Sequence, residues 1–392
     1  MKYNFDEIIN RQNTNCVKYD LNQEIFGTND ILPMWVADMD FKTPDFIIDA
    51  VKERAEHPVY GYTFRPDSYY QSIIDWVKRR NNWNIDKEWI GFCPGIVPAV
   101  NMAVMAFSNP GDKIIVQPPV YFPFFNAVEL NGRRLVYNQL QLKNGRYGFD
   151  LEDLKKKTVD PAVKMLILSN PHNPGGSVWS KTELEELATI CIENNVLIIS
   201  DEIHGDLVYK PNKYIPLSSI NNEIAQHTVS FIAPSKTFNI AGMSSASSII
   251  SNKVLRQRYN EIIEQLHIGM GNMFGIVALE AAYKNGDNWL NQLLEYLQEN
   301  VKLTQEFIES HIPEIKMIKP EGTYLVWLDF SKLGLNNKEL DDLLIKKAKV
   351  GLNSGYTFGP GGDGFMRINI ACPKPILEKA LKQIKEVVKQ LK

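Results

Sequence analysis

Short apolar runs alternate with helical patterns through the middle of the chain. Each run lacks the polar–apolar alternation of a half-exposed strand, so it predicts a strand buried on both faces of a mostly parallel sheet. One helical pattern between them opens at Ser180 with the Ser-x-x-Glu signature of a capping box. The apolar runs are residues 113–117, 163–168, 196–200, 229–233 and 246–250. This order of elements predicts an α/β fold.

The C-terminal part of the chain follows a different order. Its patterns predict a helix over about 289–311, strands over 314–318, 324–329 and 365–370, a helix over about 337–349 and an amphipathic helix over 374–392. Such an order is typical of a smaller α+β domain, and 392 residues are enough for two domains. We therefore expect a large domain over 45–285. The small domain would comprise 286–392 and the N-terminal segment 1–44 packed against it.

Charge and composition exclude several classes of function. The net charge is −3 and the basic residues are scattered, which argues against a nucleic-acid partner or an electrostatic membrane anchor. The chain shows neither a signal-peptide pattern nor a run of 18 apolar residues. Its four cysteines form no Cys-x-x-Cys pair and stand at no metal-ligand spacing from a histidine. These patterns predict a cytoplasmic protein with reduced thiols, no metal site and no membrane partner.

Chemically distinctive residues follow the predicted strands. Asn173, Asp201 and Lys236 each come shortly after a buried strand, and Gly95 opens a helical pattern upstream. Taken singly, these residues are typical of a turn, a helix N-cap, a solvated surface lysine and a helix start. Ligands of open α/β sheets, however, bind at the carboxyl ends of the strands. Together the residues offer the amide, carboxylate, amine and helix N-terminus that pyridoxal 5'-phosphate (PLP) chemistry requires.

The motifs around these residues resemble a known family. Ser-Lys-Thr-Phe-Asn-Ile-Ala-Gly at 235–242, with Asn-Pro at 173–174 and Asp-x-x-His at 201–204, is similar to the class I/II aminotransferase superfamily of PLP enzymes. Pro-Met-Trp-Val-Ala-Asp-Met-Asp-Phe at 33–41 resembles its cystathionine β-lyase, or cysteine C–S lyase, branch. The resemblance implies the PLP fold-type I architecture. In this fold a large domain contains a mostly parallel seven-stranded sheet flanked by helices, and a smaller α+β domain accompanies it.

The resemblance also implies roles for residues around the cofactor ring. Lys236 would hold PLP as a Schiff base and then shuttle the Cα proton of the substrate. Asp201 would pair with the pyridinium nitrogen, an ion pair that depresses the pKa of the carboxyl group. Asn173 would donate to the phenolate oxygen, His204 would lie near that oxygen, and Tyr121 would stack on the ring.

The phosphate and the substrate have implied partners of their own. The start of the helix at Gly95, Ile96 and Val97, with Ser235, would hold the phosphate. Tyr62 of the partner subunit would reach the same phosphate, so the resemblance implies a homodimer with a shared active site. A small amino-acid substrate would place its carboxylate against Arg367 and beside the backbone at Val36 and Ala37; these are the implied substrate contacts, together with Tyr121 and Asn173.

Two positions depart from the broader aminotransferase pattern. Ala233 stands where many relatives have Ser or Thr, and Ser244 stands where many have a phosphate-binding Arg. The phosphate pocket therefore depends more on backbone amides, hydroxyl groups and Tyr62. The missing arginine favours the lyase branch.

The expected reaction is β-elimination from L-cystathionine or a related cysteine S-conjugate, which yields a thiol, pyruvate and ammonia. An aminotransferase is the first alternative, because it would use the same residues with a keto acid as the amine acceptor. A regulatory protein that uses this fold to bind a partner is the second. A dinucleotide-binding dehydrogenase is disfavoured because no Gly-x-Gly-x-x-Gly turn follows an early strand.

Overall fold

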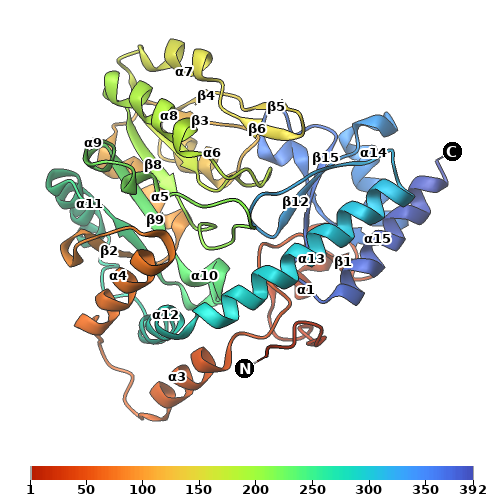
Figure 1. The fold of residues 1–392 in the computed structure, drawn as a ribbon, viewed down its shortest axis with the longest axis horizontal. Helices are drawn as coiled ribbons and strands as arrows, with labels where there is room; N and C mark the ends of the chain where they lie inside the picture. Colours follow the sequence, from red (N-terminus) through yellow and green to blue (C-terminus); the bar gives the residue numbers. More distant parts are fainter. Residues whose placement is uncertain (1, 392) are drawn as a thin grey trace.

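The computed structural model describes residues 2–391 and is built around a seven-stranded sheet (Figure 1). The strand order is β2-β10-β9-β8-β7-β3-β4, and β10 alone runs opposite to the other six strands of this sheet. The strands are β2 (Ile90–Cys93), β3 (Lys113–Val116), β4 (Arg134–Tyr137), β7 (Val163–Ser169), β8 (Leu197–Asp201), β9 (Thr228–Ile232) and β10 (Ala246–Ile249). The expected α/β fold with a mostly parallel seven-stranded sheet is confirmed.

Helices cover both faces of this sheet, and a short hairpin lies at its margin (Figure 1). The helices of this part are α3 (Asp45–Glu56), α4 (Asp67–Asn81), α5 (Ile96–Phe107), α6 (Pro123–Glu129), α7 (Leu151–Thr158), α8 (Lys181–Glu193), α9 (Asn222–Gln226), α10 (Pro234–Thr237), α11 (Lys253–Gln265) and α12 (Met273–Asn285). The hairpin pairs β5 (Gln141–Lys143) with β6 (Arg146–Gly148). Helix α8 begins at Ser180 with both hydrogen bonds of the predicted capping box.

The pattern of β7 shows why the central strands are apolar along their whole length. Met165 and Ile167 belong to the core beneath α5, whereas Leu166 and Leu168 belong to a second core that includes Leu184 of α8. Side chains alternate between the faces of a strand, and here both faces are buried. Because both faces of the central strands are covered, a ligand can reach them only at the ends of the strands.

A four-stranded antiparallel sheet forms the C-terminal part, in the order β11-β12-β15-β14. Its strands are β11 (Lys316–Ile318), β12 (Leu325–Asp329), β14 (Asn353–Ser354) and β15 (Phe365–Asn369). Helix α13 (Asp287–His311) runs from the large sheet to this one, beside α15 (Lys374–Lys389) (Figure 1). The single helix predicted over 337–349 is α14 (Asn337–Asp342), which continues as a π-helix over Leu343–Ala348.

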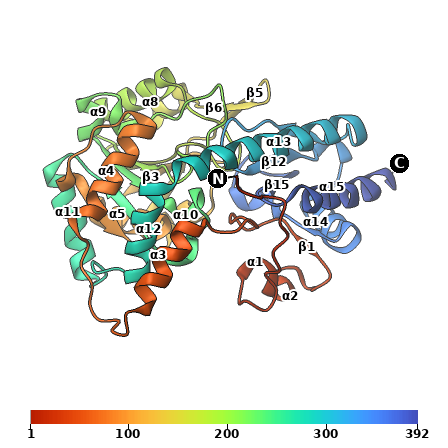
Figure 2. The same cartoon turned by 60° about the horizontal axis from the view of Figure 1, so that its bottom comes forward.

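The N-terminal segment lies against the C-terminal part, where Figure 2 shows α1 (Val17–Asp20) and α2 (Asn22–Phe26) below β1. Strand β1 (Leu32–Pro33) pairs in parallel with β13 (Val350–Gly351). Met1 and Lys392, the ends of the predicted N-terminal segment and final helix, lie outside the described residues. Within residues 2–391 no helix combines the length and apolarity that a membrane span requires.

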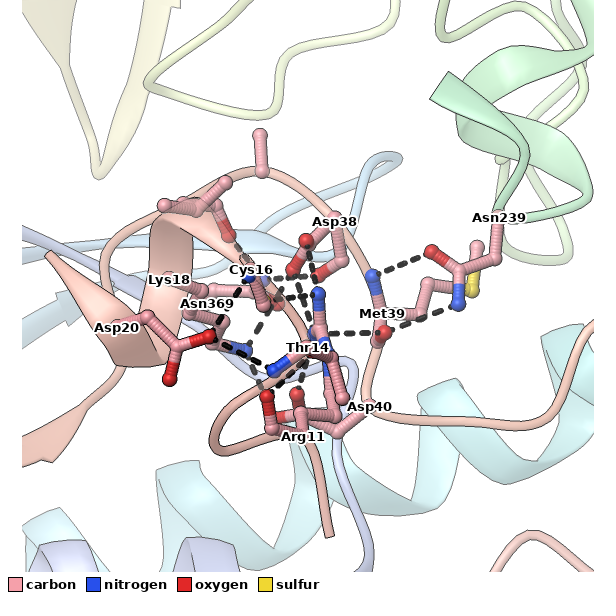
Figure 3. A network of polar contacts seen from close by, with 12 residues as sticks. Arg11, Thr14, Cys16, Lys18, Asp20, Asp38, Met39, Asp40, Asn239 and Asn369 are labelled. Atoms are coloured by element: carbon pink, nitrogen blue, oxygen red, sulfur yellow. Dashed lines mark hydrogen bonds and ion pairs between the residues drawn. The ribbon is translucent and has the colours of Figure 1, made fainter. Parts of the chain in front are cut away.

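Four charged residues join the segment 35–41 to residues 11–18 in a partly buried cluster, which we call the N-terminal ion cluster: Arg11, Lys18, Asp38 and Asp40 (Figure 3). Lys18 Nζ lies 2.7 Å from Asp40 Oδ2, and Arg11 Nη1 lies 2.7 Å from Asp40 Oδ1. Arg11 Nη2 also lies 2.5 Å from Asp38 Oδ2. Because its two cations match its two anions, the cluster can be buried without a net charge.

Replacing Lys18 with Met removes the most deeply buried cation of this cluster and keeps an unbranched side chain of similar length. Asp40 is 3% exposed, so the loss leaves a buried carboxylate with Arg11 as its remaining cationic partner. We expect the free energy of unfolding to fall by about 3 kcal/mol, as measured by urea denaturation. Lys42→Met is the control, because Lys42 forms a half-exposed pair with Asp45, and such pairs contribute little. Equal losses in both variants would contradict the prediction.

Candidate active site

A cavity of about 210 Å³ opens where the carboxyl ends of β7, β8 and β9 meet. Ser169 pairs with Asp201, and Asp201 pairs with Phe231, so the three strands end level with one another. The site residues expected from the sequence that line this cavity are Ala37, Gly95, Ile96, Val97, Tyr121, Asn173, Asp201, His204, Ser235 and Lys236. Val36, Tyr62 and Arg367 are not part of its lining. The structure thus brings ten of the thirteen expected residues together.

Lys236 enters the cavity from α10, the short helix that follows β9. Its Nζ donates to the Ala37 carbonyl oxygen at 2.6 Å. The pKa of Lys236 is lowered to about 8, chiefly by burial and in part by Arg367, while Asp38 and Asp201 act in the opposite direction. A buried amine with such a pKa is partly unprotonated near neutral pH, so it can accept a proton.

Asp201 is the last residue of β8 and lies at the floor of the cavity. The pKa of Asp201 is raised to about 7, chiefly by burial and in part by the neighbouring Glu202, although the Ile203 amide, which donates to Oδ1 at 3.1 Å, opposes the rise. The sequence predicted a depressed pKa for this carboxyl group in an ion pair. In the protein alone the shift has the opposite sign, because burial outweighs the partial pairing with Lys236.

Asn173 is joined to Arg367, which comes from β15 of the smaller sheet. Arg367 Nη1 donates to Asn173 Oδ1 at 3.0 Å, so the Asn173 side-chain nitrogen remains available as a donor. Arg367 Nη2 also donates to Asn353 Oδ1 at 2.6 Å and to the Trp35 carbonyl at 3.1 Å. Arg367 therefore does not line the cavity itself but is hydrogen-bonded to Asn173, which does. Burial lowers the pKa of Arg367 to about 10.

Two buried polar atoms at the cavity have no partner among residues 2–391: His204 Nδ1 and Ser245 Oγ. Burial lowers the pKa of His204 to about 3, with contributions from Lys236 and Arg367, so the ring is neutral. Nearby, α5 starts at Gly95, and the first amides of a helix have no acceptor within the helix. Unsatisfied buried groups are rare, so these atoms fit a polar ligand with an anionic group. The amine, carboxyl, amide and anion cradle together fit PLP.

Three expected residues differ in their surroundings. Tyr121 lines the cavity, and burial raises the pKa of its hydroxyl. Tyr62 is 96% exposed and stands outside the cavity of its own chain. The Val36 carbonyl accepts from Asn369 Nδ2 at 2.6 Å, so this carbonyl already has a donor within the chain.

The sequence did not single out every residue at this site. Ser245 lines the cavity but carries no sequence signal, because it stands in the serine-rich stretch 244–248 and serines are common in turns. Tyr324 donates from its hydroxyl to the Ala37 carbonyl at 3.0 Å. Asn239, three residues after Lys236, had a signal in the motif itself. With φ +57° it accepts from the Met39 amide and donates to the Met39 and Phe41 carbonyls, each at 2.9 Å (Figure 3).

Replacing Asp201 with Asn tests the raised pKa without any cofactor. The folded-state pKa, about 7, exceeds the ordinary value of 3.8, so the folded protein binds this proton more tightly than the unfolded chain. Wild-type stability therefore loses a contribution as the pH rises between these values. We expect cofactor-free Asp201→Asn protein to be more stable than wild type above pH 7, by roughly 4 kcal/mol. The gain should vanish near pH 4.

Denaturant titrations of the cofactor-free proteins between about pH 4 and 8 measure this difference. Asp67→Asn is the control, because Asp67 is 92% exposed. A gain that is the same at every pH would contradict the raised pKa of Asp201.

Comparison of the chain with known proteins shows the family to which it belongs. The model of the family described as aminotransferase class I and II matches residues 29–384. Cystathionine beta-lyase PatB of Bacillus subtilis (strain 168) is 44% identical over 382 residues, which cover 97% of this chain and 99% of PatB.

Two solved structures are similar over nearly the whole chain. Cystalysin of Treponema denticola, which contains a pyridoxal 5'-phosphate cofactor, has a TM-score of 0.97 and 37% identity, and all of both chains is covered. The PLP-bound C–S lyase of Staphylococcus hominis has a TM-score of 0.92 and 35% identity, with 99% of this chain and 98% of that chain covered. The chain belongs to the aminotransferase class I and II family.

Proposed function

We propose that this protein is a PLP-dependent C–S β-lyase that cleaves L-cystathionine or related cysteine S-conjugates to a thiol, pyruvate and ammonia. The observation that carries the proposal is the joint presence of Lys236, Asp201 and Asn173 at one cavity, with unsatisfied polar atoms beside the start of α5. The names of PatB, a cystathionine beta-lyase, and of the C–S lyase from Staphylococcus hominis support the reaction type.

When bound, PLP supplies an aldehyde that reacts with amines and a protonated ring that accepts the electron pair left at the substrate Cα. Asp201 would hold the proton at the ring nitrogen. That contact supplies the cationic partner that a buried carboxylate needs, and it would return the Asp201 pKa toward lower values. Asn173 would donate to the ring oxygen from the side-chain nitrogen that Arg367 leaves free.

Lys236 would act as the base that removes the Cα proton. Its pKa of about 8 supports this role, because a general base works best when its pKa lies near the working pH. Arg367 would bind the substrate carboxylate. Its guanidinium is held by three acceptors, and its buried Nε has no partner among the described residues. A preorganised cation of this kind costs little further ordering when it binds an anion.

We also propose that residues 45–285 form the cofactor-binding domain, and that 1–44 together with 286–392 form the smaller one. The separate seven-stranded and four-stranded sheets support this division, as does the pairing of β1 with β13. The proposed site nevertheless uses both parts, because Ala37 and Arg367 come from the smaller one.

The proposed assembly is a homodimer in which Tyr62 of the partner subunit reaches the cofactor phosphate. Large apolar side chains gather on the segment around Tyr62, and Val59, Tyr60 and Phe64 are all exposed in the single chain. Exposed apolar patches of this kind commonly mark a protein–protein interface. The exposed segment 59–64 would therefore contact the partner subunit and bring Tyr62 to its active site.

The lyase proposal is tested with purified PLP-loaded protein, L-cystathionine or L-cysteine, and no added keto acid. We expect steady pyruvate release while the absorbance of the cofactor stays in its aldehyde-derived form. Lys236→Ala should release no pyruvate, whereas the exposed-lysine control Lys42→Ala should match wild type. A single turnover that continues only after a keto acid is added would favour an aminotransferase and reject the lyase reaction.

The shared site is tested by mixing two inactive variants, Lys236→Ala and Tyr62→Ala. In a mixed dimer, one site combines Lys236 of the second variant with Tyr62 of the first. We expect the mixture to recover up to about a quarter of wild-type activity, because half of the dimers are mixed and each has one complete site. No recovery, with mixed dimers verified by mass spectrometry, would reject the role of Tyr62 in the neighbouring site.

A further inference from the structure

The backbone carbonyl of Ala37 accepts hydrogen bonds from two side chains that are distant in the sequence. Lys236 Nζ lies 2.6 Å from this oxygen, and Tyr324 Oη lies 3.0 Å from it. The shorter distance is typical of a charged donor in a buried site. The two donors together occupy both lone pairs of the carbonyl oxygen. When the Lys236 amine is not bonded to the cofactor, it therefore has a defined position at the Ala37 carbonyl.

We propose that the Ala37 carbonyl receives the Lys236 amine whenever that amine is not bonded to the cofactor, and that Asp38 is a positioning residue that keeps this carbonyl in place. The inference rests on the proposed function, in which Lys236 takes the substrate Cα proton. In that step the Cα–H bond breaks, an N–H bond forms at Nζ, and the electron pair passes to the cofactor ring. The ammonium group that results has three donors, and Ala37 accepts one of them.

The backbone carbonyls of the two residues on either side of Ala37 are held by one side chain, that of Asn369. Asn369 Nδ2 donates to the Val36 carbonyl at 2.6 Å and to the Asp38 carbonyl at 2.5 Å. The carboxylate of Asp38 binds Arg11 through both oxygens, at 2.5 and 3.0 Å (Figure 3). A bidentate pair fixes direction as well as distance, so the Asp38 side chain cannot rotate freely. The Ala37 carbonyl lies between these two anchors.

The second side of this contact is fixed by the helix that carries Lys236. Asn239 forms three hydrogen bonds with the backbone of Met39 and Phe41. Thr237 Oγ1 donates to Asp206 Oδ2 at 2.9 Å, and Asp206 also accepts from Trp76 Nε1 at 3.1 Å. The backbone that carries Lys236 and the backbone that carries the Ala37 carbonyl are therefore both fixed, so the fold sets how far the lysine side chain must reach.

Asp38 also acts on Lys236 through its charge. Asp38 and Asp201 are the carboxyl groups that face the amine, and Asp201, with its pKa raised to about 7, is only partly ionised near neutral pH. Arg367 is the facing cation, and the His204 ring and the Tyr324 hydroxyl are uncharged near neutral pH. Burial and Arg367 lower the pKa of Lys236, whereas Asp38 raises it. Removing the charge of Asp38 therefore weakens the binding of the proton that Lys236 takes from the substrate.

Asp38→Asn is the test, because the amide keeps the shape of the carboxylate and removes its charge. In cofactor-free protein, the rate at which an amine-reactive reagent modifies Lys236 is followed against pH by peptide mass spectrometry. We expect the midpoint to move to lower pH by roughly half a pH unit or more. In PLP-loaded protein, we expect kcat to fall roughly tenfold with KM nearly unchanged. The isotope effect with Cα-deuterated substrate should increase, because proton transfer becomes slower.

Asp45→Asn is the matched control, since Asp45 lies in an exposed pair with Lys42. An unchanged midpoint in Asp38→Asn protein would overturn the proposal. If wild-type protein releases no pyruvate, the proposed function fails, but the titration of cofactor-free Lys236 still tests Asp38. If Asp38→Asn does not fold, Tyr324→Phe carries the test, because it removes the second hydrogen bond to the same carbonyl without changing charge. A Tyr324→Phe protein with unchanged kcat and isotope effect would then overturn the proposal.

Discussion

The active-site cavity depends on one contact between distant segments, in which residues 35–41 are held against the helix that carries Lys236. Lys236 binds the Ala37 carbonyl and Asn239 binds Met39 and Phe41, so four hydrogen bonds join segments about 200 residues apart. The strand ends of the large sheet and the segments that follow them supply most of the cavity lining, and Ala37 adds the N-terminal segment to it. Asp38 and Asp40 of this segment belong to the N-terminal ion cluster, and their pairs with Arg11 and Lys18 resist its displacement. Without these pairs, a short irregular segment would have to close a site that requires placement within a fraction of an ångström.

The same cavity contains buried ionisable groups that destabilise the folded chain when no ligand is bound. Burial raises the pKa of Asp201 and lowers those of Lys236 and His204, each toward the uncharged form. These shifts have one cause, the loss of water around an ionisable group without a full set of partners. A functional site is where such shifts are tolerated, because the ligand supplies the missing partners. Lys18 and Asp40 differ from these groups: they are at least as deeply buried, but they are paired within the chain and anchor it.

Much of the fold could be predicted because burial on both faces leaves a clear mark on a strand. The runs at 163–168 and 229–233 became β7 and β9 within one residue or so at each end. Strands β1, β13 and β14 have two residues each, too few to show a period, and the π-helical turns after α14 depend on packing that no local pattern encodes. Lys236, Asp201 and Asn173 could be found because each follows a buried strand and belongs to a motif. Ser245 and Tyr324 could not, since a hydroxyl gains its role only from the neighbour that the fold brings to it.

The arrangement also links the stability of the chain to its ligand. His204 Nδ1 and Ser245 Oγ are buried without partners among the described residues, and each such atom lowers the stability of the folded state. A ligand that binds only the folded chain and satisfies these atoms stabilises it in proportion to the logarithm of its concentration over its dissociation constant. Ser244, where many relatives have an arginine, adds a neutral hydroxyl to the lining rather than a charge. An anionic group at the start of α5 would then be bound mainly by hydrogen bonds from neutral donors. Such a site depends on the placement of those donors rather than on long-range attraction, which is why its rigid surroundings matter as much as its composition.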